Sequence, residues 1–311
     1  MIKTFKIIEK KNLWFAFSAT LILLTIFLSM FRLSQSKALF NFGIDFLGGN
    51  MMILKFPALD DRLKNEKVSS KAIEKVFIHE MREVFQQGGY DKVAIRMSHE
   101  HEVMIKTLAL PLSDREILLD LLRKRFGGID ILEVDYIGPS IGKSLQKSAI
   151  TLVLLVSIFL LIYISFRFRL SYGLAALIAL LHDALIIFSC AALFSLEINL
   201  AFVAALLTVL GYSINDTIVV FDRIRENRSQ NPGQSLIDLI NLSLSQTLTR
   251  TLNTSMTTFF VVISLLLFGG ITIKVFSLVL LIGIIAGTYS SLCIASPFLF
   301  VFLRQEEVKI L

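Results

Sequence analysis

The chain contains a series of long apolar runs with almost no charge. The first extends from Leu13 to Phe31, and the others cover 148–166, 170–194, 200–221, 251–268 and 274–303. Runs of about 18 or more such residues can cross the hydrocarbon core of a bilayer as helices. Only 18% of the 311 residues are charged, whereas a soluble domain typically has about 25%. We therefore predict six transmembrane helices.

The short segments around the runs predict the orientation of the helices. Basic residues concentrate in the N-terminal segment 1–12, in 223–228 and in the C-terminal segment 304–311, whereas 195–199 and 269–273 contain none. Short cytoplasmic loops are enriched in lysine and arginine. A cleaved signal peptide shares the basic start, but its apolar stretch is shorter and a cleavage site follows it. We expect a retained first helix and both termini in the cytoplasm.

Residues 32–147 separate the first two runs and have the composition of a folded domain. Their patterns predict a strand at 51–56, a helix at 69–87, two strands at 92–97 and 103–108, a second helix from Ser113, and a strand at 129–136. The order β-α-β-β-α-β is that of the split, ferredoxin-like arrangement. The expected fold is a membrane all-α bundle of six transmembrane helices with an α+β ferredoxin-like extracytoplasmic domain inserted between helices 1 and 2.

A few polar residues interrupt the fourth and fifth runs. An acidic side chain at the centre of a span costs about 2.5–3.5 kcal/mol on insertion scales, so it normally faces protein or water. Asp216 lies in the fourth run, with Tyr212 one helical turn earlier and Asn215 beside it. A second polar stripe, which includes Thr247, Arg250 and Thr254, begins just before the fifth run and continues into it. The two stripes can meet inside the bundle.

These residues favour a proton-coupling site. Beside Arg250 the Asp216 carboxylate keeps its charge, and in apolar surroundings it takes up a proton. His182 and Asp183, in the third run, form a second candidate, because imidazole can accept a proton at one nitrogen and donate one at the other. Simpler interpretations stay open: Arg250 extends to the membrane surface, Asp216 is a neutral structural acid, and His182 and Asp183 only join helices.

Other kinds of site are not expected. His99 and His101 have no third ligand nearby in the sequence, so we predict no metal site. The glycines of 43–49 precede neither Lys-Ser/Thr nor a helix, which argues against a nucleotide-binding loop. The net charge of +6 lies mainly beside the apolar runs, and no basic helix with interleaved aromatic residues suggests nucleic-acid binding. Since no enzymatic motif is present either, we expect no catalysis and no cofactor.

Several motifs resemble the SecF family of bacterial protein-translocase subunits, within the resistance-nodulation-division superfamily. They are FGIDFLGG at 42–49, IGP at 137–139, LHD at 181–183, GYSINDTIVVFDRIREN at 211–227 and QTLTRTLNTS at 246–255. The resemblance implies a separate subunit in the bacterial inner membrane, with SecD, the SecYEG channel, unfolded preprotein and membrane lipid as partners and YajC as a further candidate. It also implies use of the proton-motive force in late steps of export, with the family's intramembrane acid and arginine at Asp216 and Arg250.

Two other functions remain as alternatives. A proton-driven exporter of small molecules or lipids from the same superfamily usually duplicates the six-span unit and has large extracytoplasmic domains, whereas this chain has one span set and one small domain. A purely structural scaffold predicts that neutralising Asp216 would matter only through stability.

Overall fold

The computed structural model describes residues 5–34, 38–65, 69–90, 93–98, 101–107 and 112–310. The chain divides into two compact units. We call the first the helical unit; it consists of Met1–Asn41, Ile150–Gly269 and Ile273–Leu311. The second, the sheet unit, consists of Phe42–Ala149 and Gly270–Thr272.

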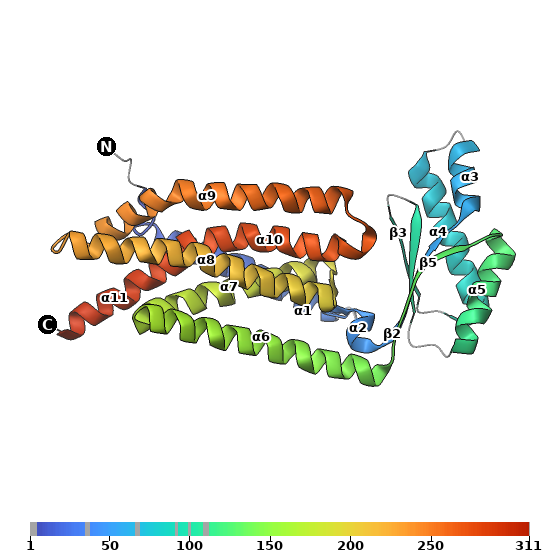
Figure 1. Cartoon of the computed structure of the whole chain (residues 1–311), viewed down its shortest axis with the longest axis horizontal. Helices are drawn as coiled ribbons and strands as arrows, with labels where there is room; N and C mark the ends of the chain where they lie inside the picture. The colour runs from blue at the N-terminus through green and yellow to red at the C-terminus, as the bar shows by residue number, and fades with distance from the viewer. Residues whose placement is uncertain are drawn as a thin grey trace. The chain divides into compact units, whose positions relative to one another are not determined.

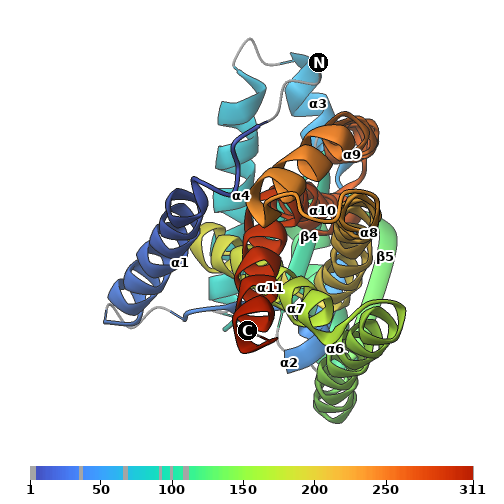
Figure 2. The same ribbon diagram turned by 90° about the vertical axis from the view of Figure 1, so that its left-hand side faces the viewer.

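Six helical segments in the described residues are long and apolar enough to cross a membrane, as the sequence predicts. Five of them are single helices: α1 (Lys11–Ser34), α6 (Pro139–Arg167), α7 (Leu170–Phe194), α8 (Leu200–Gln230) and α9 (Leu236–Phe268). The sixth combines α10 (Lys274–Ser290), the π-helical segment η2 (Ser291–Ala295) and α11 (Ser296–Ile310), after the short 3₁₀ helix η1 (Ile271–Ile273). Figure 1 shows α8, α9 and α10 side by side, and Figure 2 shows the bundle from its end.

Several helices extend beyond the apolar runs that predicted them. α6 begins at Pro139 rather than near 148, and proline suits the first helical position because its missing N–H has no partner there anyway. α9 begins at Leu236 rather than near 251, because the Ser235 side chain accepts a hydrogen bond from the Asp238 N–H at 3.2 Å. Hydropathy marks only the apolar part of a helix, whereas capping residues determine where the helix begins.

The last span changes its winding without a break in the chain. Within η2 the helix forms a π turn, an uncommon geometry that is frequent at functional sites. Two serine hydroxyls hydrogen-bond to main-chain carbonyl oxygens at this turn. Ser296 donates to the Ser291 carbonyl at 3.2 Å, and Ser291 donates to the Gly287 carbonyl at 2.8 Å. The apolar run at 274–303 therefore contains two α-helices joined by a π turn.

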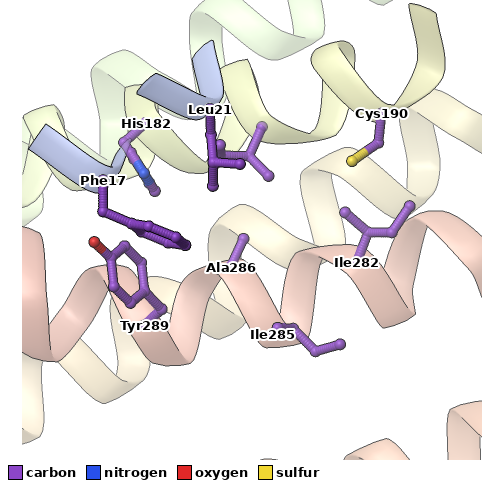
Figure 3. A pocket seen from close by; sticks show the side chains of 9 residues that line it. Phe17, Leu21, His182, Cys190, Ile282, Ile285, Ala286 and Tyr289 are labelled. Atoms are coloured by element: carbon purple, nitrogen blue, oxygen red, sulfur yellow. The ribbon is translucent and has the colours of Figure 1, made fainter. Parts of the chain in front are cut away.

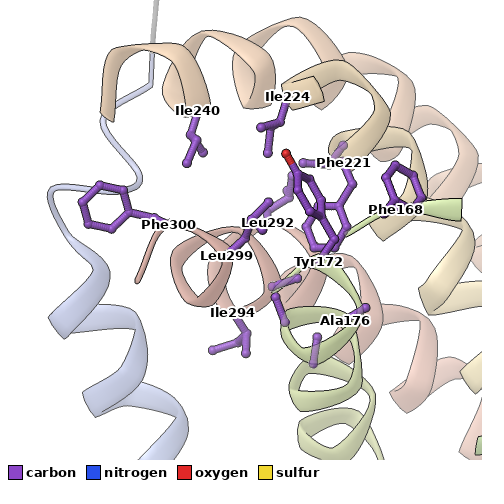
Figure 4. Packing of buried hydrophobic residues seen from close by; sticks show 14 of the residues in the cluster. Phe168, Tyr172, Ala176, Phe221, Ile224, Ile240, Leu292, Ile294, Leu299 and Phe300 are labelled. Carbon is purple, nitrogen blue, oxygen red and sulfur yellow. The ribbon is translucent and has the colours of Figure 1, made fainter. Parts of the chain in front are cut away.

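The helical unit has a core of buried apolar side chains where α7, α8, α9 and α11 meet (Figure 4). The Tyr172 ring stacks on Phe168 with centroids 5.5 Å apart and meets Phe221 edge-on at 5.3 Å. Beyond this core, α8 and α10 approach closely at two glycines. A Cβ added at Gly283 would lie 2.1 Å from Cγ2 of Val209, and one at Gly287 would lie 2.9 Å from Cβ of Ser213. The glycines therefore permit the contact between these helices.

The sheet unit contains a four-stranded sheet whose neighbouring strands are all antiparallel. The strand order is β3 (Val93–Met97), β4 (Glu102–Thr107), β2 (Gly49–Lys55) and β5 (Asp130–Ile137). α4 (Ser70–Gln87) and α5 (Leu112–Phe126) cover one face, as Figure 1 shows. The chain also forms two two-residue strands, β1 (Asn41–Phe42) and β6 (Glu197–Ile198).

The sheet unit contains one helix that the sequence did not predict, and one residue considered for a metal site cannot be compared with the structure. Helix α3 (Pro57–Asn65) was not predicted, because its charged residues hide Leu59, the one fully buried position among residues 57–64. His99, one of the two histidines considered for a metal site, lies outside the described residues. His101 adopts a left-handed backbone conformation with φ of 61° after β3.

The glycines of the FGIDFLGG motif have a backbone role. They surround the one-turn helix α2 (Ile44–Leu47). Gly48 has a φ of 79°, in the left-handed region that glycine adopts without steric cost. A Cβ at Gly142, near the start of α6, would lie 2.9 Å from the carbonyl oxygen of Phe46. The motif therefore packs main chain against main chain within the sheet unit.

Replacing Phe77 by alanine is expected to destabilise the sheet unit by about 3–5 kcal/mol, the usual cost of truncating a buried phenylalanine. Phe77 is completely buried, and its ring contacts those of Phe56 and Phe126 at centroid distances of 5.3 and 4.7 Å. Hydrogen exchange of the β2 and β4 amides in the full chain measures the effect. The adjacent Val76→Ala is the control because Val76 is 54% exposed; equal exchange in both variants would contradict the prediction.

Candidate functional site

Asp216 lies on α8 and is buried, with only 3% of its surface exposed. Its Oδ2 atom is 3.5 Å from the Ser255 hydroxyl on α9, which is long for a hydrogen bond. The Ser255 hydroxyl lies 2.7 Å from that of Thr288 on α10. Asp216, Ser255 and Thr288 therefore bring together α8, α9 and α10; we call this group the Asp216 site.

Arg250 lies on α9 near the Asp216 site. It is close enough to act electrostatically on the Asp216 carboxyl group, but its side chain is exposed. Among the described residues, no ion pair within 4.0 Å joins the two groups. Thr254, one turn further along α9, is also exposed and donates to the Arg250 carbonyl at 3.1 Å. The structure thus shows Asp216 without direct neutralisation by its predicted partner.

The other residues of the predicted stripes do not gather around Asp216. Asn215 is exposed, and the buried Thr247 hydroxyl donates to the carbonyl of Ser243 in its own helix at 3.0 Å. The buried hydroxyl of Tyr212 has no hydrogen-bond partner in the part of the chain that the structure describes. Spacing along a helix predicted which residues share a side, but not which of them would interact.

His182 and Asp183 on α7 form a second buried site, with 8% and 0% of their surfaces exposed. His182 Nδ1 lies 3.2 Å from Asp183 Oδ1. The other carboxylate oxygen, Oδ2, accepts hydrogen bonds from Ser213 on α8 at 2.6 Å and from Ser290 on α10 at 2.8 Å. These contacts join three helices at one carboxyl group.

This second site continues from the histidine ring to the first helix. His182 Nε2 lies 3.1 Å from the hydroxyl of Ser18 on α1, which in turn lies 3.0 Å from the hydroxyl of Tyr289 on α10. Tyr289 donates to the main-chain carbonyl of Trp14 at 3.0 Å. We call the group His182, Asp183, Ser18, Tyr289, Ser213 and Ser290 the Asp183 site.

Sequence reasoning identified His182 and Asp183 but none of the four hydroxyl groups around them. Serine and threonine are common in transmembrane helices and usually bond to their own backbone, as Ser157 does to Val153 at 2.8 Å. The sequence contained no signal that distinguished Ser18 or Ser290 from such residues.

The two sites share helices α8 and α10. Ser213 and Asp216 are three residues apart on α8, and Thr288 and Ser290 are two apart on α10. The Asp216 site connects this helix pair to α9, whereas the Asp183 site connects it to α7 and α1. Movement of α8 against α10 would therefore change the surroundings of both carboxyl groups.

A cavity of about 330 Å³ lies next to the Asp183 site, between α1, α7 and α10 (Figure 3). His182 and Tyr289 contribute its polar groups, and the remaining lining is formed by Phe17, Leu21, Ile186, Cys190, Ile282, Ile285 and Ala286. The aromatic rings of His182 and Tyr289 have centroids 5.8 Å apart. One side of the His182 ring therefore faces an apolar space.

Within the described residues, no group of three histidine, cysteine, aspartate or glutamate side chains is arranged to hold a metal ion. Cys190 and Cys293 are both free thiols. The chemistry that these two sites offer is proton binding and hydrogen bonding by carboxyl, imidazole and hydroxyl groups.

Comparison with known proteins identifies the class. Residues 118–305 match the family described as protein export membrane protein SecD/SecF, C-terminal, which places the chain among protein-export membrane proteins. A protein translocase subunit SecF from Sebaldella termitidis is 37% identical over 303 residues, which cover 97% of this chain and 93% of that protein. One from Rickettsia prowazekii is 35% identical over 309 residues, covering 98% and 93%. The chain belongs to the SecF family, and the predicted resemblance is confirmed.

Solved structures agree with this assignment. The crystal structure of SecDF, a translocon-associated membrane protein from Thermus thermophilus, matches with a TM-score of 0.81 and 30% identity over 97% of this chain. SecDF in a super-membrane-facing form matches with a TM-score of 0.68 and 29% identity. The chain spans 39% and 40% of the lengths of these two SecDF chains.

Proposed function

We propose that this chain is the SecF-type accessory subunit of the Sec translocase and assists preprotein export across the bacterial inner membrane. The observation that carries the proposal is its similarity to SecF proteins along nearly the whole chain. SecD is the first partner that we propose, because the matching solved structures are of SecDF, of which this chain covers 39% and 40%. The SecYEG channel, YajC and unfolded preprotein are the further partners that follow from the family.

The proposed arrangement has both termini in the cytoplasm and the sheet unit outside it. The basic residues beside alternate spans support this orientation. We also assign the split, ferredoxin-like arrangement to the sheet unit, and the strand order β3-β4-β2-β5 with α4 and α5 on one face supports that assignment. The sheet unit then offers a sheet and two helices to a partner, and the subunit acts without enzymatic chemistry of its own.

The proposed energy source is the proton-motive force, coupled through Asp216 with Arg250 and through His182 with Asp183. Burial of both carboxyl groups supports this proposal, since an acidic group inside a span is costly unless it serves a function. The force supplies about 2.3 kcal/mol per charge per 100 mV and about 1.4 kcal/mol per pH unit. Such energies are large enough to shift a helix arrangement between two states.

Complementation tests the proposal. Bacteria depleted of their own SecF should recover export of a pulse-labelled secreted precursor when they express this chain together with the SecD of its own source. The chain must be present in the membrane and co-purify with SecD. Continued precursor accumulation under those conditions would contradict the proposal. An exporter of small molecules or lipids would instead change the efflux of such compounds and leave the precursor unprocessed.

A further inference from the structure

The hydroxyl groups of the Asp183 site determine where the protons lie. A hydroxyl group has one proton and donates one hydrogen bond. Tyr289 uses its proton on the Trp14 carbonyl oxygen at 3.0 Å, because a carbonyl oxygen can only accept. The 3.0 Å contact between Tyr289 and Ser18 therefore uses the proton of Ser18.

This assignment leaves Ser18 without a proton for its second partner. The contact between Ser18 Oγ and His182 Nε2, at 3.1 Å, is a hydrogen bond only if Nε2 carries the proton. On the other side of the ring, one proton lies between Nδ1 of His182 and Oδ1 of Asp183, which are 3.2 Å apart. The His182–Asp183 pair therefore holds two protons, as imidazolium with carboxylate or as imidazole with carboxylic acid.

Both forms of the pair have a net charge of zero. Zero net charge suits the site, because the two side chains are almost completely buried in a span, where an uncompensated charge is costly. The alternative, a neutral ring with Nε2 unprotonated beside a carboxylate, would leave one negative charge there. Ser213 donates to Asp183 in either form. Ser290 does so as well, because its 2.8 Å contact with Asp183 is shorter than its 3.2 Å contact with the Gly287 carbonyl.

Four other titratable groups lie around the pair in the part of the chain that the structure describes. They are Tyr289 on α10, Cys293 in η2 near Tyr289, Cys190 on α7 across the cavity, and Asp216 on α8, three residues after Ser213. α1 contributes Ser18, which does not titrate. Within the described part of the chain, no lysine or arginine side chain hydrogen-bonds to His182 or Asp183.

We propose that the Asp183 site is a second proton-binding site, in which Ser18 and Tyr289 are positioning residues that hold the proton on Nε2 of His182. When the pair gives one proton to solvent, Nε2 becomes an acceptor. Ser18 must then turn its hydroxyl toward Nε2, so that Tyr289 keeps a hydrogen bond to Ser18 only by leaving the Trp14 carbonyl. Proton release thus breaks one of the two hydrogen bonds between Tyr289 and α1. A role of this change in protein export rests on the proposed function, whereas the assignment of the protons rests on the hydrogen bonds alone.

The test is ¹⁵N solid-state NMR of the full chain in lipid bilayers, with labelled histidine. The chain has four histidines, so His79→Gln, His99→Gln and His101→Gln leave His182 as the only one. At neutral pH we expect the Nε2 resonance at the chemical shift of a protonated ring nitrogen. Tyr289→Phe removes the acceptor that occupies the Ser18 proton, so the Nε2 resonance should move toward that of an unprotonated nitrogen. Phenylalanine keeps the ring contacts with Trp14 and Phe17.

Tyr163→Phe is the matched control, because Tyr163 lies on α6 and is 54% exposed; its spectrum should equal that of the parent. An unprotonated Nε2 in the parent, or an unchanged spectrum in Tyr289→Phe, would overturn the proposal.

Precursor export, measured with Tyr289→Phe and Ser18→Ala, should fall severalfold. Normal export with a shifted resonance would overturn the coupling role of both residues. Failure of the unmodified chain to restore export would reject the proposed function and leave the NMR result unaffected.

Discussion

Asp216→Asn should remove most of the chain's ability to restore precursor export in cells depleted of SecF. Asparagine has nearly the same size but cannot take up and release a proton, so the variant loses the coupling at this residue. Loss of one coupled proton at 100 mV removes about 2.3 kcal/mol, equivalent to a factor of roughly 50 in a conformational equilibrium. Pulse-labelled precursor processing measures the loss, with membrane level and co-purification with SecD determined in the same cells.

The control for this experiment is a separate variant in which another carboxylate on the same helix, Asp222, is replaced by asparagine. Asp222 lies six residues further along α8, is only half-buried, and forms ion pairs with the exposed side chains of Arg225 at 2.9 Å and Arg167 at 3.8 Å. Exposed ion pairs contribute little to stability, so Asp222→Asn should export normally. Full export with Asp216→Asn would reject proton coupling at Asp216 and favour the structural scaffold.

Gly283→Ala should destabilise the helical unit by about 3 kcal/mol, the upper end of the usual cost of overpacking. The added Cβ would lie 2.1 and 2.6 Å from the two γ-carbons of Val209, so α8 and α10 must separate. Separation would also disturb both carboxyl sites, because each depends on α8 and α10. Thermal unfolding of the purified chain in detergent measures the effect.

Two further variants test whether close packing is the cause. Gly211→Ala, on α8, adds a Cβ with no heavy atom within 4 Å, so its stability should be unchanged or slightly higher. Adding Val209→Ala to Gly283→Ala removes the two closest atoms, the γ-carbons of Val209, and leaves its Cβ at 2.9 Å, so it should recover part of the loss. The prediction would be wrong if Gly283→Ala unfolded at the same temperature as the parent.

The parts of this fold that could be predicted from the sequence are those determined by local pattern. Six apolar runs became six spans because a polypeptide in hydrocarbon must satisfy its backbone by forming helices. His182 and Asp216 stood out because ionisable residues are rare inside such runs. Helix α3 was missed because four of its nine residues are charged, and one buried leucine gives too weak a periodic signal.

The hydrogen-bond partners could not be predicted, because they depend on how helices distant in sequence pack together. Ser18 and His182 are 164 positions apart, and nothing in either run indicates that they face one another. Tyr212 shows the opposite case: spacing placed it one turn before Asp216, yet its hydroxyl remains without a partner among the described residues. Periodicity assigns a side of a helix, but only packing determines which atoms meet.

The π turn at Ser291–Ala295 changes which side of the following helix, α11, faces the core. A π turn accommodates about one more residue than an α turn, and each residue of an α-helix advances about 100° around the axis. Side chains of α11 are therefore rotated by about that angle from where an uninterrupted α10 would place them. With this offset, α10 packs on α7, α8 and α9, and α11 packs on α7 and α9. Deleting one residue between 291 and 295 would restore α-helical winding and turn the buried Leu299 and Leu303 away from the core.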